Sequence, residues 1–246
     1  MEPIIFIDPG HSDRDPGAVG YETEFQLAEA VAKHKKAYLE ANYVCKPYVC
    51  PSNIDSLKEI CKLANDMGAA LFTSIHFNAG GGDGFECFVH NEKRRSLGQL
   101  YEKQMKAIGQ NSRGVKIQPN FVVLRDTNMP AVLLEGAFVD NKKDIEDWNE
   151  EQELKAMGIA YAKATAEFLQ LEEKVKTVTV ILDVLENGSQ GEQVKALQKL
   201  LGVSNDGIFG KQTEAALKKF QSENGLTADG VAGPETWQKL LGAKGG

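Results

Sequence analysis

The hydrophobic and polar residues of this chain follow two periods along most of its length. Short apolar runs bounded by Gly, Pro or polar residues occupy 4–8, 43–49, 70–76, 85–90, 121–124 and 131–135, and they predict β-strands. Segments with helical period occupy 24–41, 56–67, 94–110 and 151–171. This succession of elements predicts an α/β fold with a twisted, largely parallel or mixed sheet flanked by helices.

The pattern changes after residue 171, and we expect a first domain at 1–171 and a second at 181–246. Residues 172–180 are charged and aperiodic, which indicates a linker. Beyond them "NDGIFGKQT" recurs 23 residues later as "ADGVAGPET", an internal repeat. Each copy has an Asp-Gly turn, after which Thr213 or Thr236 stands where a helix N-cap is expected. With a further helical segment at 191–202, the repeat predicts a small all-α domain of three helices.

Composition and charge exclude several classes of protein. The 246 residues contain no run of about 18 apolar residues, so no membrane insertion is expected. A net charge of −7 argues against a nucleic-acid partner held by phosphate neutralisation. The opening "MEPIIFIDPGH" has neither a basic nor an apolar leader region, so we expect synthesis in the cytoplasm without a signal peptide. The four cysteines lack paired spacing and are expected to be reduced and mostly buried.

Three residues with metal or acid–base chemistry follow predicted strands. His11 comes after "IIFIDPG", His76 ends "LFTSIH", and Glu135 closes the apolar run "PAVLLE". Loops at the carboxyl ends of strands converge in α/β sheets, so these side chains are expected to meet. Imidazoles with nearby carboxylates are the ligands of a catalytic zinc site, which keeps a position open for water. His34, among helical lysines, is expected to be partly exposed and non-functional, and His90, after a strand, is a weaker candidate.

Three stretches of the first domain, together with their order, resemble the zinc-dependent N-acetylmuramoyl-L-alanine amidases of amidase family 3. They are "IFIDPGHSDRDPGAVG", "SIHFNAG" and "VLRDTNMPAVLLEGAFVDN", in this order along residues 4–170. The resemblance implies one catalytic zinc ion with His11 and His76 as ligands, and Glu135 as the catalytic carboxylate. "EGAF" replaces the more usual "ETGF", which leaves the glutamate in place. The resemblance also implies hydrolysis of the amide between N-acetylmuramic acid and the L-alanine of the stem peptide.

The third ligand implied by the resemblance is a glutamate at the start of the first helix, and two are available. Thr23 and Gln26 have capping-box spacing, which makes Glu24 the first helical residue. Glu24 also precedes Leu27 by three residues, on the face expected to meet the sheet. We therefore favour Glu24. Glu22 stays open as the alternative, because "YExxxQL" also occurs in similar sequences.

The second domain resembles the peptidoglycan-binding module of cell-wall hydrolases over residues 184–241, through "GSxGxxVxxLQ", "DGxFGxxT", "FQxxxGL" and "DGxxGxxTW". Bacterial peptidoglycan is thus the expected partner, and a phage or prophage endolysin acting on the wall after release is the favoured setting. The alternatives are a bacterial autolysin or spore-cortex amidase, or a wall-binding protein without activity. The oligomeric state is left open. Arg125, Asn141 and Asn78 are further candidates for binding substrate or supporting the site.

Overall fold

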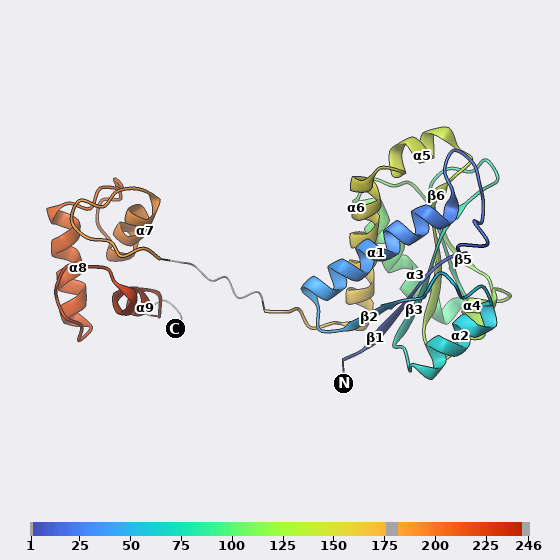
Figure 1. Ribbon diagram of the computed structural model, residues 1–246, viewed down its shortest axis with the longest axis horizontal. Coiled ribbons are helices and arrows are strands. Elements are labelled where there is room, and N and C mark those ends of the chain that lie inside the picture. The colour runs from blue at the N-terminus through green and yellow to red at the C-terminus, as the bar shows by residue number, and fades with distance from the viewer. Residues whose placement is uncertain (1, 176–181, 243–246) are drawn as a thin grey trace. The chain divides into compact units, whose positions relative to one another are not determined.

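The computed structural model describes residues 2–175 and 182–242 (Figure 1). The chain divides into two compact units, residues 1–175 and 176–246. Each unit encloses apolar clusters made only of its own described residues. Residues 176–180 of the expected linker lie outside the described residues.

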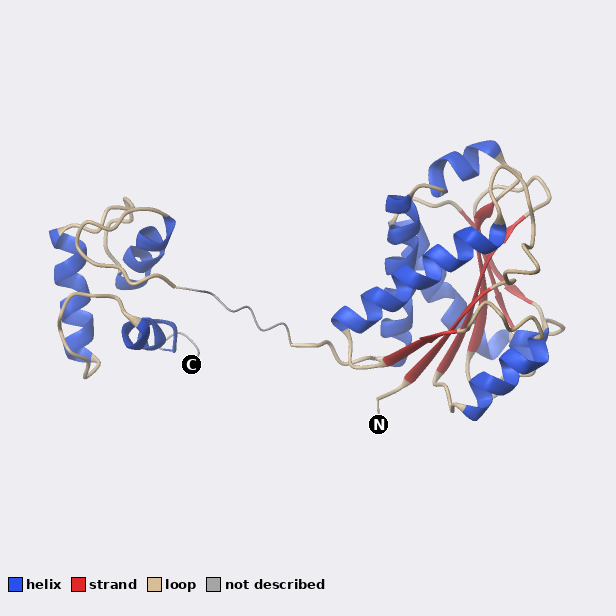
Figure 2. Ribbon diagram, in the orientation of Figure 1, coloured by secondary structure: helices blue, strands red, loops and turns tan. Residues whose placement is uncertain are grey.

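The first unit is built on one mixed sheet, as predicted (Figure 2). Its strands in spatial order are β2 (Lys46–Val49), β1 (Ile4–Pro9), β3 (Leu71–Asn78), β6 (Ala131–Phe138), β4 (Phe85–Val89) and β5 (Ser112–Ile117). Neighbouring strands are parallel except for the antiparallel pair β4 and β6. The carboxyl ends of β1, β3 and β6 therefore meet the amino ends of β4 and β5 at one edge.

Helices cover the two faces of the sheet unequally. One face is covered by the long helices α1 (Glu24–Asn42), α3 (Arg95–Ala107) and α6 (Glu151–Leu169), and α3 is preceded by the short η1 (Glu92–Arg94). The other face is covered by the shorter α2 (Leu57–Asp66) and α4 (Val122–Arg125). α5 (Lys142–Trp148) follows β6. Of the described helices, none is long and apolar enough to cross a membrane.

The face under α2 and α4 is apolar only over part of each strand. Phe6 and Leu133 are buried there, and two residues farther along the same strands stand Asp8 and Glu135. Side chains two apart in a strand share a face. On this face the strands thus continue from an apolar core into polar residues, among them His76 of β3. Because α2 and α4 are short, this polar end of the strands is available for a functional site.

Two predictions for the first unit are wrong, each for a physical reason. The run at 121–124 is not a strand: it contributes to the helical turn α4. Its backbone hydrogen bonds are local, with the Arg125 N–H donating to Phe121 O at 2.9 Å, whereas a strand would pair with a neighbouring strand. Conversely, β5 was not predicted because it is a polar edge strand, "SRGVKI", with no alternating apolar pattern. The short α5 was also not predicted.

The second unit contains the three expected helices, α7 (Glu192–Leu201), α8 (Lys211–Glu223) and α9 (Pro234–Gly242). The predicted N-caps are wrong. α8 begins after Gly210, and α9 begins with Pro234, so Thr213 and Thr236 lie within the first turns and are buried. The threonine hydroxyls face inward because each accepts a hydrogen bond from a buried glutamine amide, Gln198 Nε2 at 3.0 Å and Gln221 Nε2 at 3.2 Å.

The repeat encodes two copies of this glutamine contact. Gln198 also donates to Asp206 Oδ1 at 2.8 Å and accepts from the Gly207 N–H at 2.9 Å. Gln221 makes the equivalent bonds to Asp229 and Gly230 at the same distances. A buried amide with its donors and acceptor satisfied stabilises each Asp-Gly turn against the preceding helix.

Candidate metal and catalytic site

Three elements bring one side chain each to the polar end of the sheet. His11 follows β1 with a positive φ of 71°, Glu24 is the first residue of α1, and His76 lies in β3. Glu24 Oε1 lies 2.8 Å from His76 Nδ1 and 3.0 Å from His11 Nε2. One atom from each residue lies within 4.8 Å of the others, so this group could hold a metal ion.

Two glycines of the first motif leave room for the imidazoles. A Cβ at Gly10 would lie 2.2 Å from the His76 ring, and one at Gly17 would lie 2.5 Å from the His11 ring. Gly17 also has a positive φ of 69°, which other residues rarely adopt. The glycines in "DPGH" and "DPGA" are thus explained by packing against the site.

Glu24, and not Glu22, contacts both histidines. The Glu24 carboxylate is buried and also accepts backbone N–H bonds from Ala18 at 2.8 Å and Phe77 at 3.2 Å. Glu22 is partly exposed, and its contact is with Asn149 Nδ2 at 3.4 Å. Thr23 is the N-cap residue, but its side chain makes no capping hydrogen bond, so the predicted capping box does not form.

The electrostatics of the group follow from the shared carboxylate. Hydrogen bonding to Glu24 raises the pKa of His11 to about 9. Burial raises the pKa of Glu24, but hydrogen bonds with both imidazoles outweigh it and lower that pKa to about 2. Glu24 is therefore ionised throughout the physiological range, and both imidazoles face an anion.

A hydrogen-bond chain behind His76 orients its ring. Ser74 Oγ donates to Asp8 Oδ2 at 2.7 Å, and it lies 3.1 Å from His76 Nε2. Because the only hydroxyl proton points to Asp8, Ser74 accepts from His76 Nε2–H. His76 Nδ1–H donates to Glu24 Oε1 at 2.8 Å, and with Nε2–H held by Ser74, loss of the Nδ1 proton would leave the Nδ1 lone pair for a metal ion. Neither Asp8 nor Ser74 was predicted from sequence as a site residue. Asp8 belongs to the "DPGH" motif, and Ser74 lies two residues before His76 on the same face of β3, so each had a signal in the sequence.

Glu135 stands beside His76 on the next strand, β6. The two residues are register partners, and Glu135 is also paired with Glu86 of β4. Burial raises the pKa of Glu135 to about 7. Its Oε2 is buried and has no hydrogen-bond partner among the described residues. A pKa near neutrality suits a general acid or base.

The remaining candidates lie elsewhere or have structural contacts. Arg125 is paired with Asp126 just before β6, at the opposite end of that strand from Glu135. Asn141 caps α5, and its amide donates to Gly82 O at 2.7 Å. Asn78 donates to Glu86 Oε2 at 3.2 Å.

The other histidines and the cysteines do not join the group. His34 Nε2 is paired with Glu151 on α6 at 2.9 Å. His90 Nδ1 is buried without a partner in the described part of the chain. All four cysteines are free and buried, as expected.

A cavity of about 390 Å³ opens beside the three converging side chains. It is lined by His11 and His76, by apolar residues at the start of α2, and by carboxylates that include Asp55. The site therefore has space next to the group for a substrate of several atoms.

The fold and this cluster define an α/β enzyme whose site lies where parallel strands end. Residues 5–167 match the family "N-acetylmuramoyl-L-alanine amidase", and the chain belongs to that family. Residues 190–240 match the family described as "Putative peptidoglycan binding domain". The chain is thus a peptidoglycan hydrolase of the amidase class with a wall-binding module.

Individual relatives agree with this assignment. The chain is 34% identical over 177 residues to the N-acetylmuramoyl-L-alanine amidase CwlM of Bacillus licheniformis, covering 68% of this chain and 69% of that protein. It is 32% identical over 187 residues to the endolysin of Bacillus phage SPP1, covering 71% and 69%. The catalytic domain of the amidase CwlV from Bacillus (Paenibacillus) polymyxa var. colistinus superposes with a TM-score of 0.65 at 28% identity, covering 69% of this chain and 99% of that domain.

Proposed function

We propose that the chain is a zinc-dependent amidase whose metal ligands are His11, Glu24 and His76. The observation that carries the proposal is the convergence of two imidazole nitrogens on one oxygen of Glu24, at 2.8 and 3.0 Å. Two nitrogens and one carboxylate oxygen form a donor set of catalytic zinc sites. The residues present therefore fit the ion. When bound, zinc lowers the pKa of water to about 7 and polarises a carbonyl as a Lewis acid.

The chain's own residues supply the proton transfers and the orientation. Glu135, with a pKa raised to about 7 by burial, accepts a proton from the attacking water and delivers it to the departing amine. Asp8 and Ser74 keep the His76 ring in one orientation. The bond cleaved is the amide between the lactyl carboxyl of N-acetylmuramic acid and L-alanine.

The test of this function is product analysis with matched variants. Glu135→Gln keeps the shape of the side chain but cannot take up a proton, so kcat should fall about 10²- to 10⁴-fold. Mass spectrometry of muropeptides should show new N-terminal L-alanine with the native chain, and none after exhaustive chelation. Zinc should restore activity to the chelated native chain. Near-normal turnover by folded Glu135→Gln would refute the role of Glu135, and activity after chelation would refute the metal.

The favoured setting is that of an endolysin, which reaches the wall once the membrane has been opened. The order of a catalytic unit before a wall-binding unit and the phage endolysin among the relatives support it. Cells that express the chain in the cytoplasm should remain intact until a membrane-permeabilising agent is added, and should then lyse. Export of the chain by growing cells of its host, followed by wall turnover, would instead support an autolysin. Wall binding without release of L-alanine would indicate a protein without activity.

A further inference from the structure

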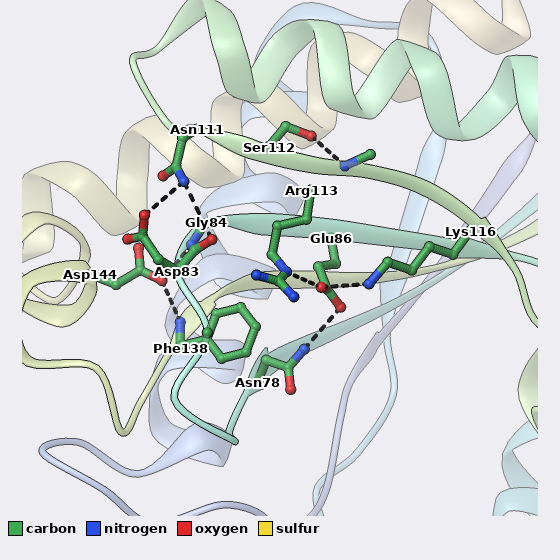
Figure 3. A network of polar contacts seen from close by, with 12 residues as sticks. Asn78, Asp83, Gly84, Glu86, Asn111, Ser112, Arg113, Lys116, Phe138 and Asp144 are labelled. Atoms are coloured by element: carbon green, nitrogen blue, oxygen red, sulfur yellow. Dashed lines mark hydrogen bonds and ion pairs between the residues drawn. The ribbon is translucent and has the colours of Figure 1, made fainter.

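A second polar network joins residues of β3, β4 and β5 (Figure 3). It lies on the face of the sheet that carries Glu135. Its centre is Glu86 of β4, which is 4% exposed and is the register partner of Glu135. Arg113 and Lys116 of β5 both donate to Glu86 Oε1. Asn78 of β3 donates to Oε2 at 3.2 Å. The proposed mechanism uses none of these four residues.

The geometry of β5 turns Arg113 toward this network. The β4–β5 register shifts between Phe85 and Cys87, so Glu86 faces an extra residue in β5. Gly114, with a positive φ of 87°, lies in this bulge. Bulges in edge strands redirect side chains toward functional sites. The Arg113 guanidinium lies 5.4 Å from the centre of the Phe138 ring, which orients it further.

The network carries more positive charge than Glu86 requires. Lys116 and Asn78 already satisfy both oxygens of Glu86, and two cations against one carboxylate leave one positive charge. These ion pairs outweigh burial and lower the pKa of Glu86, so it stays ionised. Arg113 contacts Glu86 only through Nε. Within the described residues, its two Nη groups donate no hydrogen bond. Its side chain is 45% exposed, so these donors are available to a ligand.

The neighbouring carboxylates of Asp83 and Asp144 are not ion-paired with Arg113 or Lys116 in the described part of the chain. Asp83 accepts from Asn111 Nδ2 at 2.9 Å, and Asp144 accepts backbone N–H bonds from Gly84 and Phe138 (Figure 3). On the other side of the metal ligands, the 390 Å³ cavity is lined by apolar residues and carboxylates, with no lysine or arginine among its lining residues. Arg113 and Lys116 thus place cationic groups on the β5 side of the site, whereas the cavity toward α2 has an acidic and apolar lining.

We propose that Arg113 binds a free carboxylate of the stem peptide, that of the residue after L-alanine, with Lys116 in support. A planar guanidinium with two free N–H groups matches a carboxylate in a bidentate manner. The network lies one to two strand spacings from Glu135, about 5–10 Å. That span is comparable to the reach of two extended residues, about 7 Å. The inference rests on the proposed amidase function.

The proposal also fixes the direction of the substrate across the sheet. In peptidoglycan the residue after L-alanine is a glutamate linked through its γ-carboxyl, so its α-carboxyl is either free or amidated. The anionic peptide then runs toward β5, and the uncharged glycan occupies the cavity beside α2, whose lining offers a carboxylate no lysine or arginine.

The test compares two synthetic disaccharide tripeptides that differ only in this group, one with the free α-carboxylate and one with the amide. The native chain should cleave the acid with a kcat/KM about 10- to 100-fold higher, because a charge-assisted hydrogen-bond pair is lost with the amide. Arg113→Gln should lose most of this preference, mainly through KM for the acid. Arg113→Lys keeps the positive charge but lacks the planar pair of N–H donors. Its preference for the acid should therefore lie between those of the native chain and Arg113→Gln.

Arg125→Gln is the matched control, because Arg125 is also about half-exposed, at 49%, and ion-paired, but at the other end of the sheet. It should leave the preference unchanged. Equal cleavage of both substrates by the native chain would overturn the proposal while leaving the amidase function intact, as would full preference in folded Arg113→Gln. Failure of the native chain to cleave either substrate would overturn the amidase function and this proposal together.

Discussion

At the scale of residues, the site depends on one carboxylate that serves two imidazoles. Glu24 is placed by four contacts: the two histidines and the backbone N–H groups of Ala18 and Phe77. Its neighbour Glu22 has the same chemistry but makes none of these contacts. Position within the first turn of α1, rather than residue type, therefore distinguishes the two glutamates.

Glu24→Ala should abolish stoichiometric zinc binding, whereas Glu22→Ala should retain it. Loss of Glu24 leaves two imidazoles without the anionic ligand, and a site with two ligands holds zinc poorly. Atomic emission measured after dialysis against a low zinc concentration gives the metal content. Circular dichroism controls for folding. Zinc retained by Glu24→Ala and lost from Glu22→Ala would reverse the assignment.

At the scale of elements, α1 both supplies Glu24 and buries a lysine against the sheet. Lys35 is fully buried, and its Nζ donates to Thr73 Oγ1 of β3 at 2.6 Å. It also lies 5.5 Å from the centre of the Tyr101 ring on α3. No carboxylate is paired with it in the described part of the chain, and burial lowers its pKa well below the usual 10.5. Packing of α1 against the sheet therefore favours the uncharged form of the Lys35 amine.

Lys35→Met should stabilise the chain most at low pH. The unfolded state binds a proton to Lys35 below about 10.5. The folded state does not bind it above its lowered pKa, so the native free energy of unfolding rises with pH across this window. The contribution is at most about 1.4 kcal/mol per pH unit.

The measurement is denaturant unfolding of both chains from pH 6 to 10. The advantage of Lys35→Met should shrink as pH rises, because the native amine no longer has to lose a proton. Lys33→Met is the control, since Lys33 lies on the same helix with an exposed side chain paired with Glu29. A pH-independent difference for Lys35→Met would contradict the buried neutral amine.

At the scale of the whole molecule, catalysis and wall binding belong to separately cored units. The amidase family matches 5–167, and the binding-module family matches 190–240. The clusters around Phe6 and Ile7 in the first unit and Trp237 in the second share no described residue. Each unit can therefore be tested by itself.

A chain of residues 1–175 should fold and cleave a soluble muropeptide at a rate close to that of the full chain. It should release less from intact walls, because it lacks the binding module. Residues 176–246 alone should sediment with purified walls. Rates on soluble and insoluble substrates, with a sedimentation assay for both pieces, check this. Equal activity of 1–175 and the full chain on walls would show that the second unit does not target the enzyme.

Much of this structure could be predicted from sequence because its signals are local. Apolar runs gave five of the six strands, all but β5. The polar strand β5 had no distinctive period, and the apolar run at 121–124 is too short to distinguish a helical turn from a strand. In both segments the environment is set by neighbours distant in sequence. The same limit applies to Arg113, which looks like an ordinary surface residue until the bulge in β5 places it beside Glu86.

The sequence by itself determined the class of fold, the two-part organisation and the motif residues His11, His76 and Glu135. These follow from periodicity and from short motifs that are contiguous in the chain. Only the tertiary structure decided which glutamate meets the histidines, how Ser74 and Asp8 orient His76, and that Arg113 faces the site. Those relations join residues from different strands and helices, and strand register and helix docking fix them through burial that no local pattern encodes.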